Sequence, residues 1–295
     1  MHSLFYYHLF ASIVHIASFV LLLQLVPQKN EKKYQLAIPY ALYGEEMGLQ
    51  FLYEEVFGLI SIGTLLLVNE AITSVSHLIG LLGFGLYRQR MVEDDRHLEI
   101  VRRYVEYAIT AALLEMSIYL LVGGRDFNLL LAIVVTNVVV QILGYMLERS
   151  KNQQRQLYLN LSGFLLLLVP VVSFLTIGPL TEGFLGLTVY YTLLYSLFGF
   201  HSLAHILSPA WRAFVDKDAG FLLLGVATKE ILTWMVVGLQ AHLMVEHSVD
   251  TEHSLGDYVV LADFLVWLPI VGIALALVGI FVSSRFPIRD EYESV

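Results

Sequence analysis

The chain contains no cysteine among its 295 residues. This absence excludes disulfide bonds, thiolate catalysis, palmitoylation and cysteine-based metal sites. Charged residues are scarce as well, because they make up 15% of the sequence, against about 25% in soluble domains. The few lysines and arginines form no basic stripe, so nucleic acid is not an expected partner. An ordinary soluble domain is therefore excluded.

Long apolar runs take the place of charge. Hydrophobic residues make up 57% of the chain, and the mean hydropathy is +0.70. A helix needs about 20 apolar residues to cross a bilayer. We therefore predict an all-α polytopic protein in membrane lipid. The segments that reach spanning length are 3–26, 53–83, 99–121, 127–147, 157–178, 184–207, 219–244 and 258–284.

The distribution of lysine and arginine predicts the orientation, because basic loops stay on the cytoplasmic side. Twelve of the 17 basic residues fall on the side that carries both chain ends, and four fall on the opposite side. Both termini are therefore expected in the cytoplasm. The first segment has neither a basic region before it nor a small-residue cleavage site, so we expect a retained helix and no signal peptide.

The domain organisation follows from these segments. We expect one bundle over residues 1–244, with an external loop at 27–52 whose aromatic and apolar residues favour a hairpin. Residues 245–295 then comprise an acidic external loop, the segment 258–284 and a short cytoplasmic tail. The histidines and carboxylates of loop 245–257 match no metal-ligand spacing, so we predict a solvated loop and no metal.

Lys229 is the one lysine or arginine deep inside an apolar segment. An ammonium at the centre of a bilayer costs roughly 2.5–3.5 kcal/mol by insertion measurements. Such a lysine is usually paired with a carboxylate, deprotonated, or converted by an aldehyde into a Schiff base. A purely structural ion pair is the plain alternative.

Glu106 is predicted to lie at the depth of Lys229, because both fall near the membrane midplane when counted at about 1.5 Å per helical residue. A carboxylate there offsets the cost of burying a cation. We expect Thr110, one turn further on, to donate to this carboxylate. Alternatively, Glu106 pairs only with Arg102 or Arg103, both of which are expected at the membrane interface.

His15, His77 and His201 also lie within apolar segments. Thr73 is four residues before His77, and Glu70 is seven before it, so these three share roughly one helix face. His15 is central, and the other groups fall on the cytoplasmic side of Lys229, which favours proton storage on that side. Each histidine taken alone can instead be a hydrogen-bonded packing residue.

Two further acids within the segments have no predicted role. Glu230 adjoins Lys229 but points about 100° away on a helix, so it is a poor direct counterion. Glu115 lies on the external half. The burial of Glu230 is unexplained unless it faces the segment 258–284 or a polar cavity.

A glycine and several aromatic residues favour a long apolar ligand near the lysine. Gly225, one turn before Lys229, leaves room beside it, and Pro170 can kink its helix. Core packing explains the aromatic residues equally well. The aromatic candidates are Tyr107, Phe198, Phe200, Trp234, Tyr190, Tyr191 and Tyr195.

At these residues the chain resembles the heliorhodopsin family, the inverted seven-helix retinal proteins distinct from other microbial rhodopsins. The resemblance covers roughly residues 3–244. The order and spacing of its motifs are more specific than any single one. The motifs are Arg103-Tyr-Val-Glu-Tyr107, Val135-Thr-Asn137, Gly144-Tyr145, Val169-Pro170, Leu197-Phe-Gly-Phe-His-Ser202 and Val226-Ala-Thr-Lys-Glu-Ile-Leu-Thr-Trp234.

The resemblance implies a seven-helix rhodopsin-like bundle in which Lys229 carries all-trans retinal as a protonated Schiff base and Glu106 is the counterion. It further implies that His15 and His77 belong to a proton-accepting network and that Thr73 lies near the counterion. A homodimer is also implied, with the first external loop folded as strands. The matching retinal-pocket positions are Asn137, Val140, Pro170, Phe200 and Trp234.

Three departures from the family pattern stand out. Gly225 occupies a position that is usually serine, so one hydrogen bond near the Schiff base is expected to be missing. His201 replaces an asparagine and adds a titratable group. The segment 258–284 is expected to be an eighth, C-terminal transmembrane helix, or else a stretch lying against the bundle near the interface.

The resemblance favours a light-responsive photoreceptor with a slow photocycle, a sensory or signalling role and no enzymatic activity. The charged C-terminal tail of the chain can contact a cytoplasmic signalling partner or remain solvated. A light-gated or light-driven proton transporter is the second interpretation, since Glu115 outside and Glu70, His77 and His201 inside can complete a path. A non-photochemical membrane carrier or enzyme that uses Lys229 as an ion-pair residue is the third.

Overall fold

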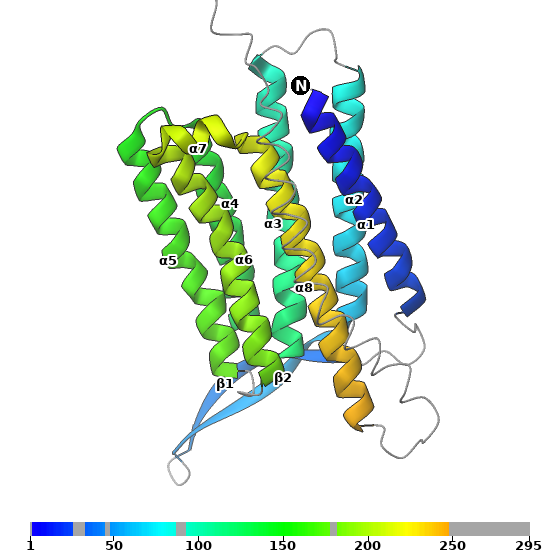
Figure 1. Cartoon of the computed structure of the whole chain (residues 1–295). Helices are drawn as coiled ribbons and strands as arrows, with labels where there is room; N and C mark the ends of the chain where they lie inside the picture. The colour runs from blue at the N-terminus through cyan, green and yellow to red at the C-terminus, as the bar shows by residue number, and fades with distance from the viewer. Residues whose placement is uncertain (1, 26–32, 45–47, 87–92, 178–181, 248–295) are drawn as a thin grey trace, which may run out of the picture.

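The computed structural model describes residues 2–25, 33–44, 48–86, 93–177 and 182–247. Within these ranges the chain is a bundle of helices with one β-hairpin (Figure 1). Seven helices are long and apolar enough to span a membrane, which confirms the predicted helical membrane bundle. These are α1 (His2–Leu25), α2 (Ile62–Leu86), α3 (Glu93–Leu121), α4 (Phe127–Arg149), α5 (Gln153–Ile177), α6 (Glu182–Leu207) and α8 (Lys217–His247).

Two smaller elements connect the spanning helices. A hairpin of β1 (Lys33–Gly44) and β2 (Gly48–Ser61) joins α1 to α2, and the short helix α7 (Pro209–Phe214) joins α6 to α8. The strands are antiparallel, and the hairpin lies at the end of the bundle opposite the N-terminus (Figure 1). The helix α7 lies at the other end.

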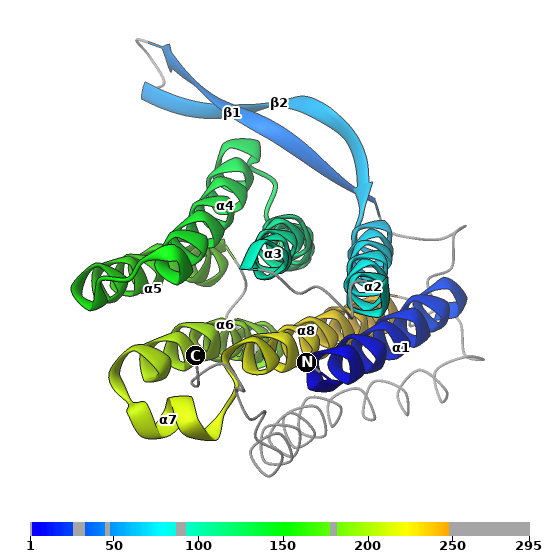
Figure 2. The same ribbon diagram turned by 90° about the horizontal axis from the view of Figure 1, so that it is seen from above.

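The spanning helices form a closed ring. Contacts run from α1 through α2, α3, α4, α5 and α6 to α8, which packs back against α1. Figure 2 shows this order from above. The helix α3 also contacts α8 across the ring. Side chains on the facing sides of α3 and α8 can therefore meet inside the bundle.

The interior is divided between an apolar and a polar half. The main apolar cluster, with Leu114, Ile118 and Tyr191 at its centre, fills the half nearer the hairpin. Most of the buried histidines, carboxylates and arginines, among them His77 and Arg103, lie on the helix stretches nearer the end that carries the N-terminus and α7, whereas Glu115 lies in the apolar half. Most of the outward-facing residues are leucine, valine and isoleucine, as contact with lipid requires.

Local hydrogen bonds explain where two of the helices begin. Asp126 caps α4, because its carboxylate accepts from the backbone N–H groups of Asn128 and Leu129. Ser61 does the same for α2, since its Oγ accepts from the N–H of Thr64 at 3.0 Å. Gly123, in the turn between α3 and α4, adopts a φ of 97°, a conformation that favours glycine.

The expected helix start at residue 53 is wrong. Residues 53–61 belong to β2 and pair with β1, up to the pair Lys33 and Ser61. This stretch carries Val56, Phe57 and Ile60, whose branched or aromatic side chains suit a strand as well as a membrane helix. The hairpin predicted for 27–52 is present and extends further along the chain.

Other boundaries also moved. The helix α5 begins at Gln153, where a loop was expected up to residue 156, and α7 lies inside the loop expected at 208–218. Ser208 caps α7, and Pro209 occupies its first turn, where a missing N–H costs nothing. The segment 258–284 and most of loop 245–257 lie outside the described residues.

Candidate functional site

Lys229 lies on α8 with its side chain inside the ring. Its Nζ is 2.5 Å from Oε1 of Glu106 on α3, and it donates a 3.2 Å hydrogen bond to Oγ1 of Thr73 on α2. The ring centroid of Tyr107 lies 5.0 Å from the same nitrogen. The structure therefore brings Lys229, Glu106 and Thr73 together at one point, beside an aromatic face.

The Glu106 carboxylate has further partners. Its Oε2 accepts hydrogen bonds from Oγ of Ser76 at 2.6 Å and from Nη1 of Arg102 at 3.0 Å. The pairing with Lys229 and the pairing with Arg102 therefore coexist. The Arg102 side chain is only 14% exposed and also binds Glu99, so it is packed inside the bundle. Two cations thus compensate the buried charge of Glu106.

One other expectation on α3 is wrong. The Thr110 hydroxyl donates to the backbone carbonyl of Glu106 at 2.9 Å, not to its carboxylate, because a helical threonine readily reaches the carbonyl one turn back. Arg103 is buried and bridges α4 and α8. Its guanidinium donates to Glu148 at 2.6 Å and to Asp218 at 2.9 Å.

A second cluster forms around His15 on α1. Nδ1 of His15 lies 2.7 Å from Oε2 of Glu70 on α2 and 2.9 Å from Oε1 of Glu230 on α8. Asn69 and Thr233 both donate to Oε1 of Glu70, at 3.0 and 3.1 Å. The ligand atoms of the histidine and the two carboxylates lie within 4.8 Å of one another, a spacing that metal sites also have. The cluster ties α1, α2 and α8 together.

The burial of Glu230 is explained by α1. Its Oε2 accepts from the hydroxyl of Ser18 and, at 3.1 Å, from Nε1 of Trp234. As predicted, Glu230 is not a direct partner of Lys229. The indole N–H of Trp234 also donates to Ser18 at 2.9 Å, which turns Trp234 toward α1.

His77 connects the two clusters. Its Nε2 lies 4.0 Å from Oε1 of Glu106, and its ring stacks on that of His15 at 5.6 Å between centroids. On its other side, Nδ1 of His77 is 3.1 Å from Nδ1 of His8, whose Nε2 is 3.3 Å from Glu99. Polar groups therefore continue from Lys229 toward the N-terminal end of the bundle.

His8 and Glu99 were not anticipated from the sequence. A signal was present, because His8 is seven residues before His15 and Glu99 is seven before Glu106. Two helical turns place such pairs on one face. The heptad spacing on α1 and α3 therefore predicts the extension of the polar network once His15 and Glu106 are identified.

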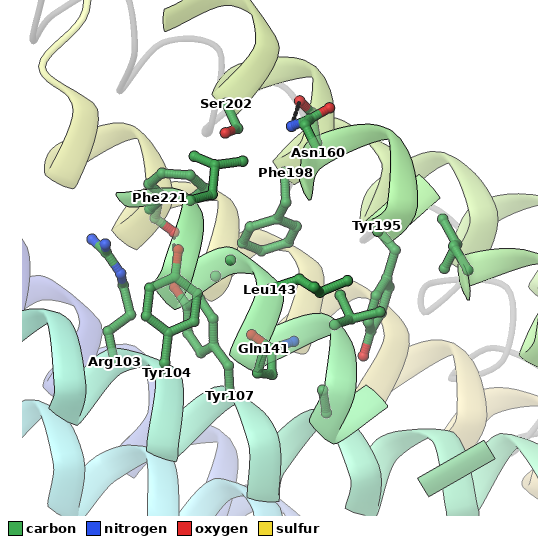
Figure 3. Close-up of a pocket in the computed structure, with 18 of the residues that line it drawn as sticks. Arg103, Tyr104, Tyr107, Gln141, Leu143, Asn160, Tyr195, Phe198, Ser202 and Phe221 are labelled. Atoms are coloured by element: carbon green, nitrogen blue, oxygen red, sulfur yellow. Dashed lines mark hydrogen bonds between the residues drawn. The ribbon is translucent and has the colours of Figure 1, made fainter. Parts of the chain in front are cut away.

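A cavity of about 150 Å³ borders Lys229. Figure 3 shows its lining side chains converging from α3, α4, α5, α6 and α8, with Tyr107, Phe198 and Tyr195 among those labelled. Most of the lining is apolar or aromatic. The lining residues that sequence reasoning did not single out include Tyr104, Ala111, Gln141, Leu143, Asn160, Gly163, Phe164, Leu167, Ser202, Phe221 and Thr228.

The sequence-predicted pocket residues divide into two sets. Tyr107, Val140, Tyr195, Phe198 and Gly225 line the cavity together with Lys229. The other predicted positions do not line it: Thr110, Asn137, Pro170, Tyr190, Tyr191, Phe200 and Trp234.

Specific contacts account for the residues outside the lining. The Asn137 amide donates to the carbonyl of Ala108 at 3.0 Å, which joins α4 to α3. Phe200 is 56% exposed on the outer face of α6 and packs on Phe164, with their ring centroids 5.1 Å apart. Pro170 is buried within α5. Helical periodicity does not fix the rotation of each helix, so the sequence alone could not decide which of these side chains line the cavity.

His201 does not join the His15 cluster. Its Nε2 contacts the carbonyl of Lys217 at 3.1 Å, and its Nδ1 accepts from the indole of Trp211 at 3.4 Å. Its ring also lies 4.9 Å from that of Phe221. His201 therefore binds the segment from α7 to the start of α8, and its predicted place in a shared proton network is wrong.

Glu115 is separated from these groups. It is buried in the apolar half, where Oε1 accepts from the hydroxyl of Tyr191 at 2.6 Å. The Tyr191 ring packs against Tyr195, a cavity residue, with centroids 4.4 Å apart. Among the described residues, Oε2 of Glu115 has no hydrogen-bond partner.

The geometry of the site suits the formation of an imine between the amine of Lys229 and an apolar aldehyde. Lys229 borders a cavity with largely apolar and aromatic walls, and Glu106 supplies a negative charge for a cationic imine. Histidines lead from that carboxylate toward one end of the bundle. These residues fit covalently bound retinal, in the chemistry of the amine and in the character of the cavity.

Comparison with known proteins agrees with this geometry. A family model described as Heliorhodopsin matches residues 4–240. This range contains every residue of the site and all seven spanning helices except the outermost turns. No match to this chain was found among curated proteins.

Proposed function

Because the chain belongs to the heliorhodopsin family, we propose that it is a light-responsive receptor in which Lys229 carries all-trans retinal as a protonated Schiff base. The family binds retinal through a lysine, and Lys229 is the only lysine on the cavity wall among the described residues. The observation that carries the proposal is the pair formed by Lys229 and Glu106 at the edge of an apolar cavity. When bound, retinal supplies light absorption and isomerisation.

The side chains of this protein then determine where charge and protons go. Glu106 compensates the positive charge at Lys229, and Thr73 and Ser76 orient the two groups. His77, 4.0 Å from Glu106, is the nearest histidine and receives a proton from this region. The ring of His15, held by Glu70, stacks on His77 and fixes its position.

A sensory role is favoured by how the titratable groups are distributed. The contacts that leave Lys229 through His77 lead toward the N-terminal end, and the opposite half is mainly apolar. A proton that moves within this arrangement returns by the same side. Slow return from a buried histidine cluster produces a long-lived signalling state.

The decisive experiment is an absorption spectrum of the purified protein with all-trans retinal. We expect a visible band to the red of free retinal, which hydroxylamine bleaches in the light and which Lys229→Ala abolishes. Lys151→Ala, which removes an exposed lysine at the bundle end, is the matched control and keeps the band. A protein that forms no band under any reconstitution condition contradicts the proposal, and Lys229 is then a structural ion-pair residue.

Proton transport is the second candidate, and Glu115 favours it. This carboxyl group is buried on the other side of Lys229 and contacts Tyr191, which leads through Tyr195 to the cavity. Light-dependent currents under voltage clamp distinguish the two functions. A current that follows the pH gradient and disappears in Glu115→Gln supports transport, whereas no current from an intact pigment supports sensing.

Orientation and assembly belong to the same proposal. The end with the N-terminus and α7 carries Arg149, Lys151, Arg155 and Arg212, which supports a cytoplasmic position for this end. The external hairpin is the proposed contact of a homodimer. Protease accessibility of an N-terminal tag tests the first point, and light scattering of the purified protein, with and without the hairpin substitution Tyr40→Lys, tests the second.

A further inference from the structure

We propose that a basic cavity at the α7 end of the bundle binds a phosphate-bearing anion, with the headgroup of an anionic phospholipid as its membrane source. The cavity has a volume of about 380 Å³ and is lined from α5, α6, α7 and the start of α8. It is separate from the cavity beside Lys229, with which it shares no residue. This site is independent of the proposed light response.

The charge of the lining has one sign. Three cationic side chains, Lys151, Arg212 and Lys217, border the cavity, and no lining residue is acidic. They come from three places in the sequence, namely the turn before α5, the helix α7 and the first residue of α8. Convergent cations of this kind bind phosphate groups, and basic pockets at the cytoplasmic face bind anionic lipid headgroups.

His205 supplies a second, independent observation. It lines the cavity and is only 9% exposed, yet its Nε2 has no hydrogen-bond partner among the described residues. A buried donor without a partner costs free energy, so such atoms usually mark a missing ligand or water. With its proton on Nε2, His205 can donate to an anionic oxygen in the cavity. This hydrogen bond would add to the electrostatic attraction from the three cationic side chains.

The acids near the lining also have partners outside it, and Asp218 accepts at 2.9 Å from Arg103. Glu148 is 4.0 Å from Nζ of Lys217, but it also accepts at 2.6 Å from Arg103 and at 2.9 Å from Tyr104. The carboxylate of Asp216 accepts from the N–H of Ala219 at 2.8 Å and so caps the start of α8. None of these carboxylates lines the cavity.

The walls of the cavity are held in place without a ligand. Gln153 donates to the carbonyl of Ile206 at 3.1 Å, and Gln156 donates to the carbonyl of Ser150 at 2.7 Å. These bonds join the start of α5 to the end of α6 and to the end of α4. A site with fixed walls loses little entropy on binding, which favours recognition of a small charged group.

The position of the cavity favours a lipid as the source. It lies at the end of the bundle where α5 begins and α6 ends. The neighbouring helix α7 carries the aromatic residues Trp211 and Phe214. Tryptophan and basic residues are typical of the depth of lipid headgroups. A phospholipid can therefore place its phosphate in the cavity while its chains lie along the exposed apolar surface of the bundle.

The test uses the full-length protein, purified in detergent and stripped of lipid. Thermal unfolding is followed during titration with short-chain phosphatidylglycerol, short-chain phosphatidylcholine or inorganic phosphate, and native mass spectrometry counts the bound molecules. We expect one phosphatidylglycerol to bind and raise Tm. The double variant Lys151→Ala/Arg212→Ala should bind it roughly thirtyfold more weakly, since each cation contributes about 1 kcal/mol and about 1.4 kcal/mol is tenfold in affinity.

The control removes two charges from the same end outside the cavity. Arg149→Ala/Arg155→Ala should retain the wild-type affinity within about twofold, because a local site does not depend on charges outside its lining. If inorganic phosphate saturates the site and phosphatidylglycerol binds no more tightly, the result supports the site with a free anion as its source. Binding of neither probe, or equal weakening in both double variants, overturns the proposal. His205→Gln, which keeps a donor near the cavity, should weaken binding less than the loss of the two cations.

Discussion

The hydroxyl of Tyr107 occupies the space where a side chain at Gly225 would begin, one helical turn before Lys229. The same hydroxyl donates to the carbonyl of Phe221 at 2.9 Å. A glycine at this position therefore lets α3 and α8 approach each other through a tyrosine.

The first prediction follows from this contact. Gly225→Ser, which introduces the residue usual in the family, should displace the Tyr107 hydroxyl and lower Tm, because overpacking costs about 1–3 kcal/mol. The double variant Gly225→Ser/Tyr107→Phe removes the clashing oxygen and should recover much of that loss. Thermal unfolding of the wild type, Gly225→Ser, Tyr107→Phe and the double variant gives the coupling between the two sites. A Gly225→Ser protein as stable as the wild type contradicts the close contact.

The second prediction concerns the counterion. Glu106→Gln keeps the shape of the side chain but removes the negative charge 2.5 Å from Lys229. Breaking such a buried pair costs about 3–5 kcal/mol, so at neutral pH the visible band should give way largely to a near-ultraviolet band of the neutral imine. The Arg102 guanidinium also favours the neutral imine, because its positive charge has then lost the Glu106 carboxylate as well.

The matched control for Glu106→Gln is Glu70→Gln. This substitution also removes a buried carboxylate, but from the cluster around His15. We expect it to keep the visible band at neutral pH. An absorption spectrum of each variant decides the point, and an unchanged visible band in Glu106→Gln rules out Glu106 as the main compensating charge.

The third prediction separates the histidines. His77→Gln should slow light-driven proton transfer away from Lys229 by about tenfold or more, because it removes the histidine nearest to Glu106. His201→Gln should leave that step within about twofold, since His201 contacts Lys217 and Trp211. Flash photolysis measures both rates. Equal slowing by the two substitutions means that proton movement does not follow the contacts of His77.

The meeting of Lys229 and Glu106 could be predicted from the sequence, whereas their surroundings could not. Rise per residue fixes the depth of a side chain, and both residues are rare charges in apolar segments. Depth does not fix rotation about the helix axis, so Trp234 and Phe200 were assigned to the cavity although they face α1 and the outer surface. Glu230 likewise found its partners on α1.

Strand and helix were also difficult to separate near residue 53. An apolar run rich in branched and aromatic residues suits a membrane helix and a strand alike, and pairing with β1 decides between them. The cap formed by Ser61 was available as a signal for the start of α2. The network through His8 to Glu99 depends on packing between α1, α2 and α3, whereas the heptad spacings indicate only that His8 shares a helix face with His15 and Glu99 with Glu106.

The fourth prediction concerns Arg103, which joins three helices without touching Lys229. Its guanidinium binds Glu148 on α4 and Asp218 on α8, and its side chain is 5% exposed. Arg103→Met leaves two carboxylates without their main cation, so we expect a loss of about 3–5 kcal/mol and a large fall in Tm.

The triple variant Arg103→Met/Glu148→Gln/Asp218→Asn distinguishes the cause of that loss. If the unpaired carboxylates are responsible, the neutral triple variant should be considerably more stable than Arg103→Met alone, because no charge remains buried without compensation. If the triple variant is as unstable as the single one, the packing of the arginine on Phe221, 4.9 Å from its ring centroid, matters more than the ion pairs. Arg155→Ala, an exposed arginine at the same end, should change Tm little, so the comparison reports on burial and pairing rather than on the number of arginines.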